Sequence, residues 1–219
     1  MGLCGHAVLA RFPFEKQLMR SVQRKSAPKV AAGRVQKKNN WDLTPNYYSH
    51  AQPRVLIDRK RPGAGFRHLL RQKDLVDFIG ILPDWEHLSQ GLDALVLAPG
   101  RRYSYGYHTP GVVHIRAWNA DLWVDCSAEY YERDRYYFDR LRIPCEEQGE
   151  GVYLCKFTVE TARAYQLLNV LLHELGHHHD LMTTKAQKQA SRGEGYADKY
   201  AELHSAHIWL RYQEEFGLE

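Results

Sequence analysis

Two histidines and a glutamate in the segment HELGH are the residues whose types and spacing point most directly to chemistry. His173 and His177 are four residues apart, so on an α-helix their imidazoles lie on one face, about one turn apart. Two imidazoles placed in this way can bind the same metal ion, and Glu174 beside them can take a proton from a metal-bound water. The segment therefore predicts a metal centre with a carboxylate base.

The two histidines that follow this pair are excluded as ligands to the same ion. His178 and His179 are rotated by about 100° and 200° around the helix axis from His177, so we expect them to be solvated or to support the site. A catalytic zinc ion usually has three protein ligands and one open position, so a third ligand must come from elsewhere. The extended pattern HExxHxxGxxH does not supply it, because Asp180 and Thr183 stand where that pattern requires glycine and histidine.

A second helix, predicted within the segment 191–216, carries the best candidate for the third ligand. Glu194 lies 17 residues after His177, which leaves enough chain to turn and lay this helix beside the first. Asp198 is one turn further on and can accept a hydrogen bond from the outer N–H of a ligating histidine. Small residues would let the two helices approach closely: Gly193, Gly195, Ala197 and Ala201. Should Glu194 not bind the metal, the remaining candidates are Asp180, His204 and His207.

The larger residues of this second helix are expected to face the core. They recur at spacings of three and four, as in the buried stripe of an amphipathic helix: Tyr196, Tyr200, Leu203, His207 and Leu210. Tyr196 is two residues from Glu194 and is therefore expected to point away from the metal. The helix that carries HELGH is predicted over residues 158–180, with Thr158 or Thr161 as its N-cap.

These residues together resemble a known group of enzymes. HELGH, followed by a helix of the form E-x-x-A-[ND]-x-[FY]-A, is similar to the gluzincin-type zinc metallopeptidases, specifically the ImmA/IrrE-like branch. The matching downstream positions are Glu194, Ala197, Asp198, Tyr200 and Ala201. The similarity covers mainly residues 171–201, with a looser architectural fit over about 92–215. It implies one Zn²⁺ per chain, a glutamate base and peptide hydrolysis.

A hydrolytic site of this kind also needs a donor for the transition-state oxyanion and a place for the substrate. Five side chains are candidate donors: Tyr105, Tyr107, His108, His114 and His204. Residues 112–117 have the composition of a β-strand, and we expect this strand to form a sheet edge to which a protein or peptide substrate adds. The sequence does not specify the substrate or the oligomeric state.

The order of the predicted elements favours an α+β fold. Strand-like segments come first, at 92–100, 111–118, 122–127 and, as a hairpin, 140–158, and helices follow from residue 158. A short helix is expected to end before Pro83. We expect a small mixed or antiparallel sheet, followed by an active-site helix and a C-terminal ligand-bearing helix, which is a zincin-like arrangement.

Charge is distributed unevenly along the 219 residues. The net charge is +4, yet residues 1–75 hold 16 Lys/Arg against 4 Asp/Glu. Residues 1–52 are therefore predicted to be a basic, flexible N-terminal extension, most clearly over 15–40, and residues 53–219 the metallopeptidase domain. The alternative function is a catalytically weak, zinc-containing regulatory or binding protein whose basic arm contacts nucleic acid or an acidic partner.

The remaining composition is that of a soluble protein. No apolar run approaches the roughly 20 residues needed to span a bilayer, and the N-terminus lacks the features of a secretory signal, so a cytoplasmic location without membrane association is expected. The four cysteines include no CxxC pair and are expected to be reduced. Cys145 and Cys155 are expected to face each other across the predicted hairpin.

Overall fold

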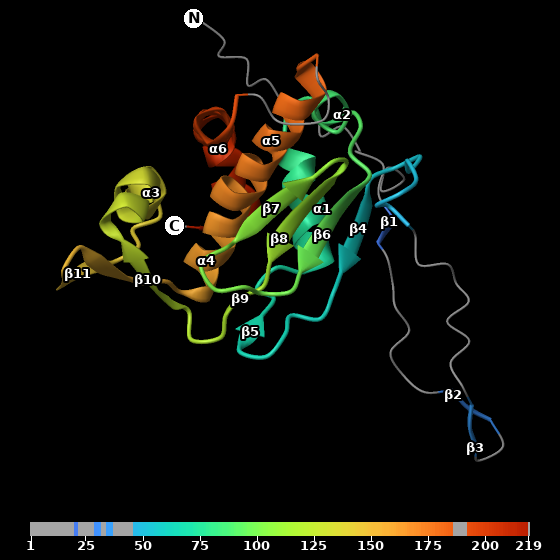
Figure 1. Ribbon diagram of the computed structural model, residues 1–219, viewed down its shortest axis with the longest axis horizontal. Helices are drawn as coiled ribbons and strands as arrows, with labels where there is room; N and C mark the ends of the chain where they lie inside the picture. The colour runs from blue at the N-terminus through green and yellow to red at the C-terminus, as the bar shows by residue number, and fades with distance from the viewer. Residues whose placement is uncertain (1–19, 22–28, 32–33, 37–45, 186–191, 219) are drawn as a thin grey trace, which may run out of the picture.

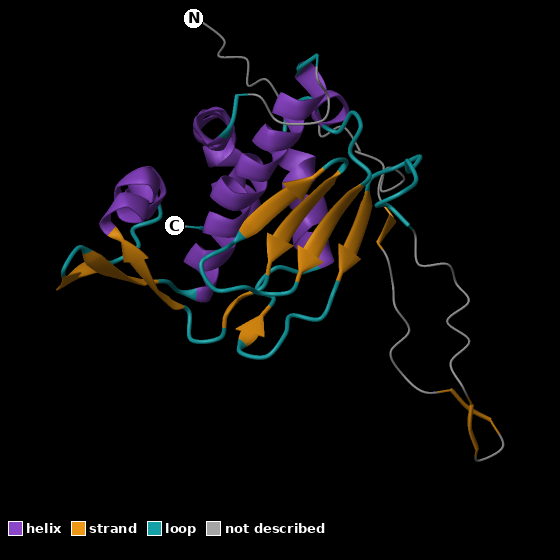
Figure 2. Cartoon of the chain, in the orientation of Figure 1, coloured by secondary structure: helices purple, strands orange, loops and turns teal. Residues whose placement is uncertain are grey.

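The computed structural model has an α+β architecture, with helices gathered on one side of a central sheet (Figure 1, Figure 2). It describes residues 20–21, 29–31, 34–36, 46–185 and 192–218. The predicted α+β class is therefore confirmed. Most of the basic segment 15–40 lies outside the described residues. Within the described part of the chain, no helix is long and apolar enough to cross a membrane.

The central sheet has five strands in the order β1-β4-β6-β8-β7. Its first four strands pair in parallel, and β7 is antiparallel to β8. The bounds are Arg20–Ser21 for β1, Leu56–Arg59 for β4, Ala94–Ala98 for β6, Gly106–Thr109 for β7 and Val112–Arg116 for β8. The mixed sheet agrees with the expectation from sequence.

The edge of this sheet lies one strand away from where the sequence placed it. Strand β8 is paired on both sides, so the prediction that residues 112–117 form the edge is wrong. The reason is the tight reversal before Val112, where Gly111 has φ of 75°. A positive φ suits glycine, and the turn folds β7 back onto β8 as the outermost strand.

Alternation along β8 separates the two faces of the sheet. Val113 and Ile115 belong to the main core, beneath the helices. Val112 belongs to a smaller cluster on the opposite face, which also contains Tyr47. Tyr47 is 3% exposed and its hydroxyl donates to Asp58 at 2.7 Å, so the folded body of the protein begins before residue 53.

A second, three-stranded antiparallel sheet has the order β10-β12-β11. Its strands are β10 (Trp123–Ser127), β11 (Cys145–Gly149) and β12 (Val152–Lys156), so the predicted hairpin is confirmed. Cys145 and Cys155 are directly paired across it as unbridged thiols, and the Cys155 Sγ lies 3.7 Å from that of Cys126. Shorter pairs complete the strands: β2 (Lys29–Ala31) with β3 (Arg34–Gln36), and β5 (Phe66–Arg67) with β9 (Trp118–Asn119).

Helix α3 (Ala128–Arg140) was not predicted, and it interrupts the expected order of strands before helices. It lies between β10 and β11 and begins at Ser127, whose hydroxyl accepts the Tyr130 N–H at 3.2 Å. Its sequence, AEYYERDRYYFDR, has several tyrosines, which favour strands. Tyr137 and Phe138 are buried against the core, so tertiary packing outweighs that local preference.

The helix that carries HELGH is longer than predicted and contains an irregular turn. It comprises α4 (Val159–Tyr165), a π-helical segment η1 (Gln166–Leu171) and α5 (Leu172–Thr183). Thr158 caps its N-terminus, since its hydroxyl accepts the Thr161 N–H at 3.1 Å. Helix α1 (Gln72–Ile81) matches the predicted short helix that ends before Pro83, and a further short helix, α2 (Trp85–Leu88), follows the proline. A π-helical turn often marks a functional site.

Helix α6 (Glu194–Phe216) packs against α5, but not through the stripe expected from the sequence. Leu203 and Leu210 are 70% and 72% exposed and His207 is also exposed, so the prediction is wrong for these three residues, whereas Tyr200 is buried as predicted. The buried face contains small residues and is displaced around the helix: Ala197, Tyr200, Ala201, Ser205, Ile208 and Tyr212. Helix α6 can approach α5 closely only where its side chains are small. The face with small residues is therefore buried, and the face with the two leucines is left exposed.

Candidate metal centre

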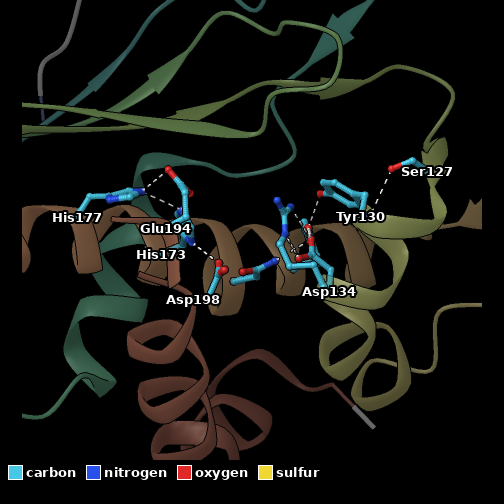
Figure 3. A network of polar contacts seen from close by, with 10 residues as sticks. Ser127, Tyr130, Asp134, His173, His177, Glu194 and Asp198 are labelled. Carbon is cyan, nitrogen blue, oxygen red and sulfur yellow. Dashed lines mark hydrogen bonds and ion pairs between the residues drawn. The ribbon is translucent and has the colours of Figure 1, made fainter. Parts of the chain in front are cut away.

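Three side chains from α5 and α6 converge on one point, as predicted (Figure 3). The Nε2 atoms of His173 and His177 are 3.1 Å apart. The Glu194 carboxylate oxygens lie 3.1 Å from His173 Nε2 and 3.4 Å from His177 Nε2. Ligands about 2.0–2.1 Å from a tetrahedral ion are separated by about 3.3 Å, so the three groups fit a single ion. Among the described residues, this is the group of His, Cys, Asp and Glu arranged to hold a metal.

Asp198 fixes the orientation of one of these imidazoles. Its Oδ1 atom lies 2.9 Å from His173 Nδ1. A hydrogen bond there places the proton of the neutral ring on Nδ1, and the lone pair of Nε2 then faces the other ligands. Burial by itself lowers the pKa of His173, but hydrogen bonding to Asp198 and the charges of Glu174 and Asp198 raise it above its ordinary value. Asp198 therefore lies where the sequence placed it, within hydrogen-bonding distance of a candidate histidine ligand.

Two contacts hold α6 in the position that presents Glu194. A Cβ atom at Gly176 would lie 2.9 Å from the Cα of Ala197, so the glycine of HELGH allows the helix backbones to touch. The buried Asp180 carboxylate accepts the backbone N–H groups of Arg192 and Gly193 at 2.8 and 3.3 Å, directly before α6. Burial opposes ionisation of Asp180, but these hydrogen bonds lower its pKa. Asp180 is thus an anchor for the chain and does not join the ligand cluster.

Glu174 has the environment of a proton acceptor that works near neutral pH. It is 6% exposed, and burial raises its pKa to about 7, while the nearby His173 opposes the rise. A Cβ atom at Gly106 would lie 2.6 Å from Glu174 Oε1, so the edge strand β7 passes directly against this carboxylate. The absence of a side chain at position 106 leaves room for Glu174 beside the ligands.

A cleft of about 790 Å³ is lined by the three candidate ligands, Glu174, Asp198 and Gly106. It lies between β7, the α4–η1–α5 helix, α3 and the start of α6. Four of its residues recur every fourth position along the long helix: Tyr165, Asn169, His173 and His177. The three candidate ligands therefore occupy one part of a longer groove, which is bordered on one side by the sheet edge.

Three of the five predicted oxyanion donors line the cleft, and two do not. Tyr105 and His108 line the cleft, and buried His108 Nε2 has no hydrogen-bond partner among the described residues. Tyr107 reaches the cleft, but its ring stacks on His114 at 3.9 Å, on the sheet face away from the helices. His114 and His204 do not line the cleft, so the structure does not bring them to the site; the His204 ring instead packs against Tyr200 of α6 at a tilt.

The other two histidines of the HELGHHH run point away from the metal cluster, as predicted, but His178 is not solvated. It is fully buried, and its Nε2 hydrogen-bonds the Gln90 carbonyl at 2.9 Å. His179 Nδ1 lies 2.6 Å from the Tyr196 hydroxyl, and the two rings stack. Tyr196 thus points away from the cleft, as expected, and is partly buried against His179.

A second polar network in the same cleft was missed by the sequence reasoning. It centres on buried Asp134 of α3, whose Oδ2 accepts the Tyr165 hydroxyl and, at 3.4 Å, the Asn169 amide. Arg133 Nε donates to the other oxygen, Oδ1, at 2.8 Å. Figure 3 shows this network and the metal cluster side by side along the long helix. The signal available in the sequence was the four-residue spacing that extends from His173 back through Asn169 to Tyr165.

Comparisons with protein-family models, with curated proteins and with solved structures find no match to this chain.

Proposed function

We propose that the protein is a zinc-dependent peptidase. The observation that supports this most strongly is the placement of buried Glu174 beside the convergent ligand atoms of His173, His177 and Glu194, in a cleft bordered by a sheet edge. Each part has a role in metal-assisted hydrolysis: a ligand set with an open side, a base and a place for an extended peptide.

Zinc is the metal that best suits the donor set. Two imidazole nitrogens and one carboxylate oxygen form a ligand combination typical of catalytic zinc in peptidases. Harder cations such as Mg²⁺ and Ca²⁺ prefer sites built from oxygen. The similarity of HELGH and the downstream Glu194 helix to ImmA/IrrE-like metallopeptidases points to the same ion. A zincin-like fold is part of this proposal.

The chemistry is divided between the ion and the protein. When bound, zinc lowers the pKa of water and polarises the substrate carbonyl. Glu174 accepts a proton from the attacking water and delivers it to the leaving amine, for which a pKa near 7 is suited. Asp198 holds the His173 ring in the tautomer that binds metal. Tyr105 and His108 line the cleft and are proposed as donors of a hydrogen bond to the oxyanion.

The substrate is proposed to bind as an additional strand along β7. An edge strand has backbone N–H and C=O groups on its outer side that an extended peptide can pair with. Gly106 lies on this strand against Glu174, so a peptide paired here passes the base and the ligand cluster. The strand proposed to pair with the substrate is therefore residues 106–109, in place of residues 112–117.

The test is the pair of wild type and Glu174→Gln, incubated with a mixture of synthetic peptides and followed by mass spectrometry. We expect both proteins to retain about one zinc per chain and only the wild type to cleave. Cleavage by both would remove Glu174 from the mechanism. Stoichiometric zinc without cleavage by the wild type would favour the alternative, a zinc-containing regulatory protein that uses its basic N-terminal arm to bind nucleic acid or an acidic partner.

A further inference from the structure

One cation in the cleft is held rigidly at a distance from the metal ligands. The Arg133 guanidinium donates from Nε to Asp134 Oδ1 at 2.8 Å and from Nη2 to Oδ2 at 3.5 Å. Its Cζ atom lies 4.5 Å from the centre of the Tyr130 ring. An ion pair on one edge and an aromatic face below it restrict the rotamers of a side chain that is otherwise long and mobile.

The partner that fixes Arg133 is itself well supported. Asp134 is 4% exposed and accepts the Tyr165 hydroxyl, and Tyr165 accepts a hydrogen bond from Tyr130 at 2.6 Å. Asn169 adds its amide to the same oxygen at 3.4 Å. The buried carboxylate is therefore satisfied from several sides, and it does not require the whole guanidinium of Arg133 for its stability.

The opposite edge of this guanidinium remains open to the cleft. The Arg133 side chain is 51% exposed, whereas that of Asp134 is 5% exposed. Arginine has five N–H donors, and Asp134 engages only two of them. Among the described residues, the remaining donors make no hydrogen bond with the protein. Asp198, the other acid nearby, is engaged by His173.

The position of Arg133 relative to the base follows from the neighbouring rings. Tyr130, on which Arg133 stacks, lies 6.2 Å from the ring of Tyr105, which directly precedes Gly106 on the edge of the sheet. Gly106 is the residue against Glu174. The fixed cation therefore lies beyond the N-terminal end of β7, at the end of the cleft near α3, and a peptide that pairs with β7 and passes Glu174 extends toward it.

We propose that Arg133 forms a subsite for a carboxylate of the substrate, close to the scissile bond. This inference rests on the proposed peptidase function and specifies its substrate class: peptides with a negatively charged group on the α3 side of the cleft. The group is either the C-terminal carboxylate or an Asp or Glu side chain. A planar guanidinium binds either group through two parallel hydrogen bonds, and its prior immobilisation by Asp134 reduces the entropy lost on binding.

The test uses acetylated hexapeptides of one sequence in matched pairs. One pair differs in a C-terminal carboxylate or amide, and the other, amidated, carries glutamate or glutamine at an internal position. Dissociation constants are measured with zinc-loaded Glu174→Gln, and kcat/KM with wild type. We expect one carboxylate peptide to bind roughly 10- to 100-fold more tightly than its neutral partner, as for a charge-assisted contact. The pair that shows the effect identifies the source of the carboxylate.

The decisive variant is Arg133→Gln, with Arg135→Gln as its control. Arg135 is on the same helix, is 56% exposed and pairs with Glu132 outside the cleft. Arg133→Gln should abolish the preference and Arg135→Gln should retain it. Equal affinity for both members of each pair in the parent protein, or a preference that survives Arg133→Gln, would overturn the subsite.

Folding and catalysis are monitored separately in this experiment. Zinc content and thermal unfolding report whether Arg133→Gln is folded. Arg133→Lys keeps a cation beside Asp134 but lacks the paired N–H donors of a planar guanidinium, so it should reduce the preference several-fold. A binding preference that depends on Arg133 in a protein that cleaves nothing would support the subsite and refute the peptidase. Cleavage without any preference would refute the subsite and leave the peptidase proposal standing.

Discussion

The Nδ1 atom of His173 lies 2.9 Å from Oδ1 of Asp198, so a residue on α6 determines how an imidazole on α5 faces the other ligands. The same helix contributes Glu194 one turn earlier. The candidate metal centre therefore depends on the packing of two helices and on residues outside the proposed ligand set. The predictions below follow from this dependence.

Asp198→Asn should weaken zinc binding by about 10- to 100-fold, because a neutral amide oxygen attracts the Nδ1 proton of His173 less strongly than a carboxylate does. The affinity is measured by competition with a chromophoric chelator. Glu202→Gln, one turn further along α6 on an exposed position, should leave the affinity unchanged. Equal affinities for Asp198→Asn and wild type would show that Asp198 does not orient the ligand.

Gly176→Ala should destabilise the protein by roughly 1–3 kcal/mol and weaken zinc binding, because the added Cβ would lie 2.9 Å from the backbone of α6 at Ala197. Urea unfolding and the same chelator competition measure the two effects. Gly195→Ala is the matched control, since a Cβ there has no atom within 4 Å. It should be neutral or slightly stabilising. If the two variants behaved alike, close contact at Gly176 would have no role.

Gly106→Ala should reduce peptide cleavage at least tenfold while zinc remains bound. The new methyl group would lie 2.6 Å from Glu174 Oε1 and 2.7 Å from Val170 Cγ1, and it therefore displaces the base, while none of these nearest atoms belongs to a ligand. Zinc content and kcat/KM are measured on the same preparation. Unchanged cleavage would mean that the carboxylate of Glu174 tolerates movement and would weaken its assignment as the base.

His114→Gln should make the protein less sensitive to acid. Burial lowers the pKa of His114 from 6.5 to about 4, so the folded state binds fewer protons than the unfolded state between these values. Stability then rises with pH over this range, is fully present above about 6.5 and is lost as the pH falls toward 4. The difference corresponds to roughly 3 kcal/mol.

The measurement for His114 is the free energy of urea unfolding at pH 7 and at pH 4.5. Wild type should lose more stability between the two than His114→Gln does. The Tyr48 hydroxyl lies 3.0 Å from His114 Nε2 and can donate to the neutral ring but not to the protonated one, which favours the same sign. An identical loss in both proteins would contradict this account.

The candidate metal ligands could be predicted from the sequence because most of them are related by short spacings within one helix. His173 and His177 are related by one helical turn, and Glu194 and Asp198 by another, so only the docking of two helices had to be inferred. The hydrophobic stripe of α6 could not be predicted, because the contact at Gly176 and Ala197 selects small side chains over exposed Leu203.

Non-local relationships account for the other differences. The edge strand depends on which partner β8 acquires after the turn at Gly111, and composition does not encode that choice. The Asp134 network depends on α3 and on a tertiary contact with Tyr165. Helix α3 was not predicted because its tyrosines are residues that favour strands. A buried acid on an unrecognised helix gives little signal in a single sequence.

The central claim is that His173, His177 and Glu194 bind one zinc ion, and metal analysis of purified protein tests it most directly. Wild type, Glu194→Ala and the control Glu202→Ala are prepared without chelators, and zinc is determined by inductively coupled plasma mass spectrometry alongside circular dichroism. The account predicts about one zinc per chain in wild type and Glu202→Ala and a large loss in folded Glu194→Ala. Wild type without stoichiometric zinc, or Glu194→Ala with undiminished zinc, would contradict it.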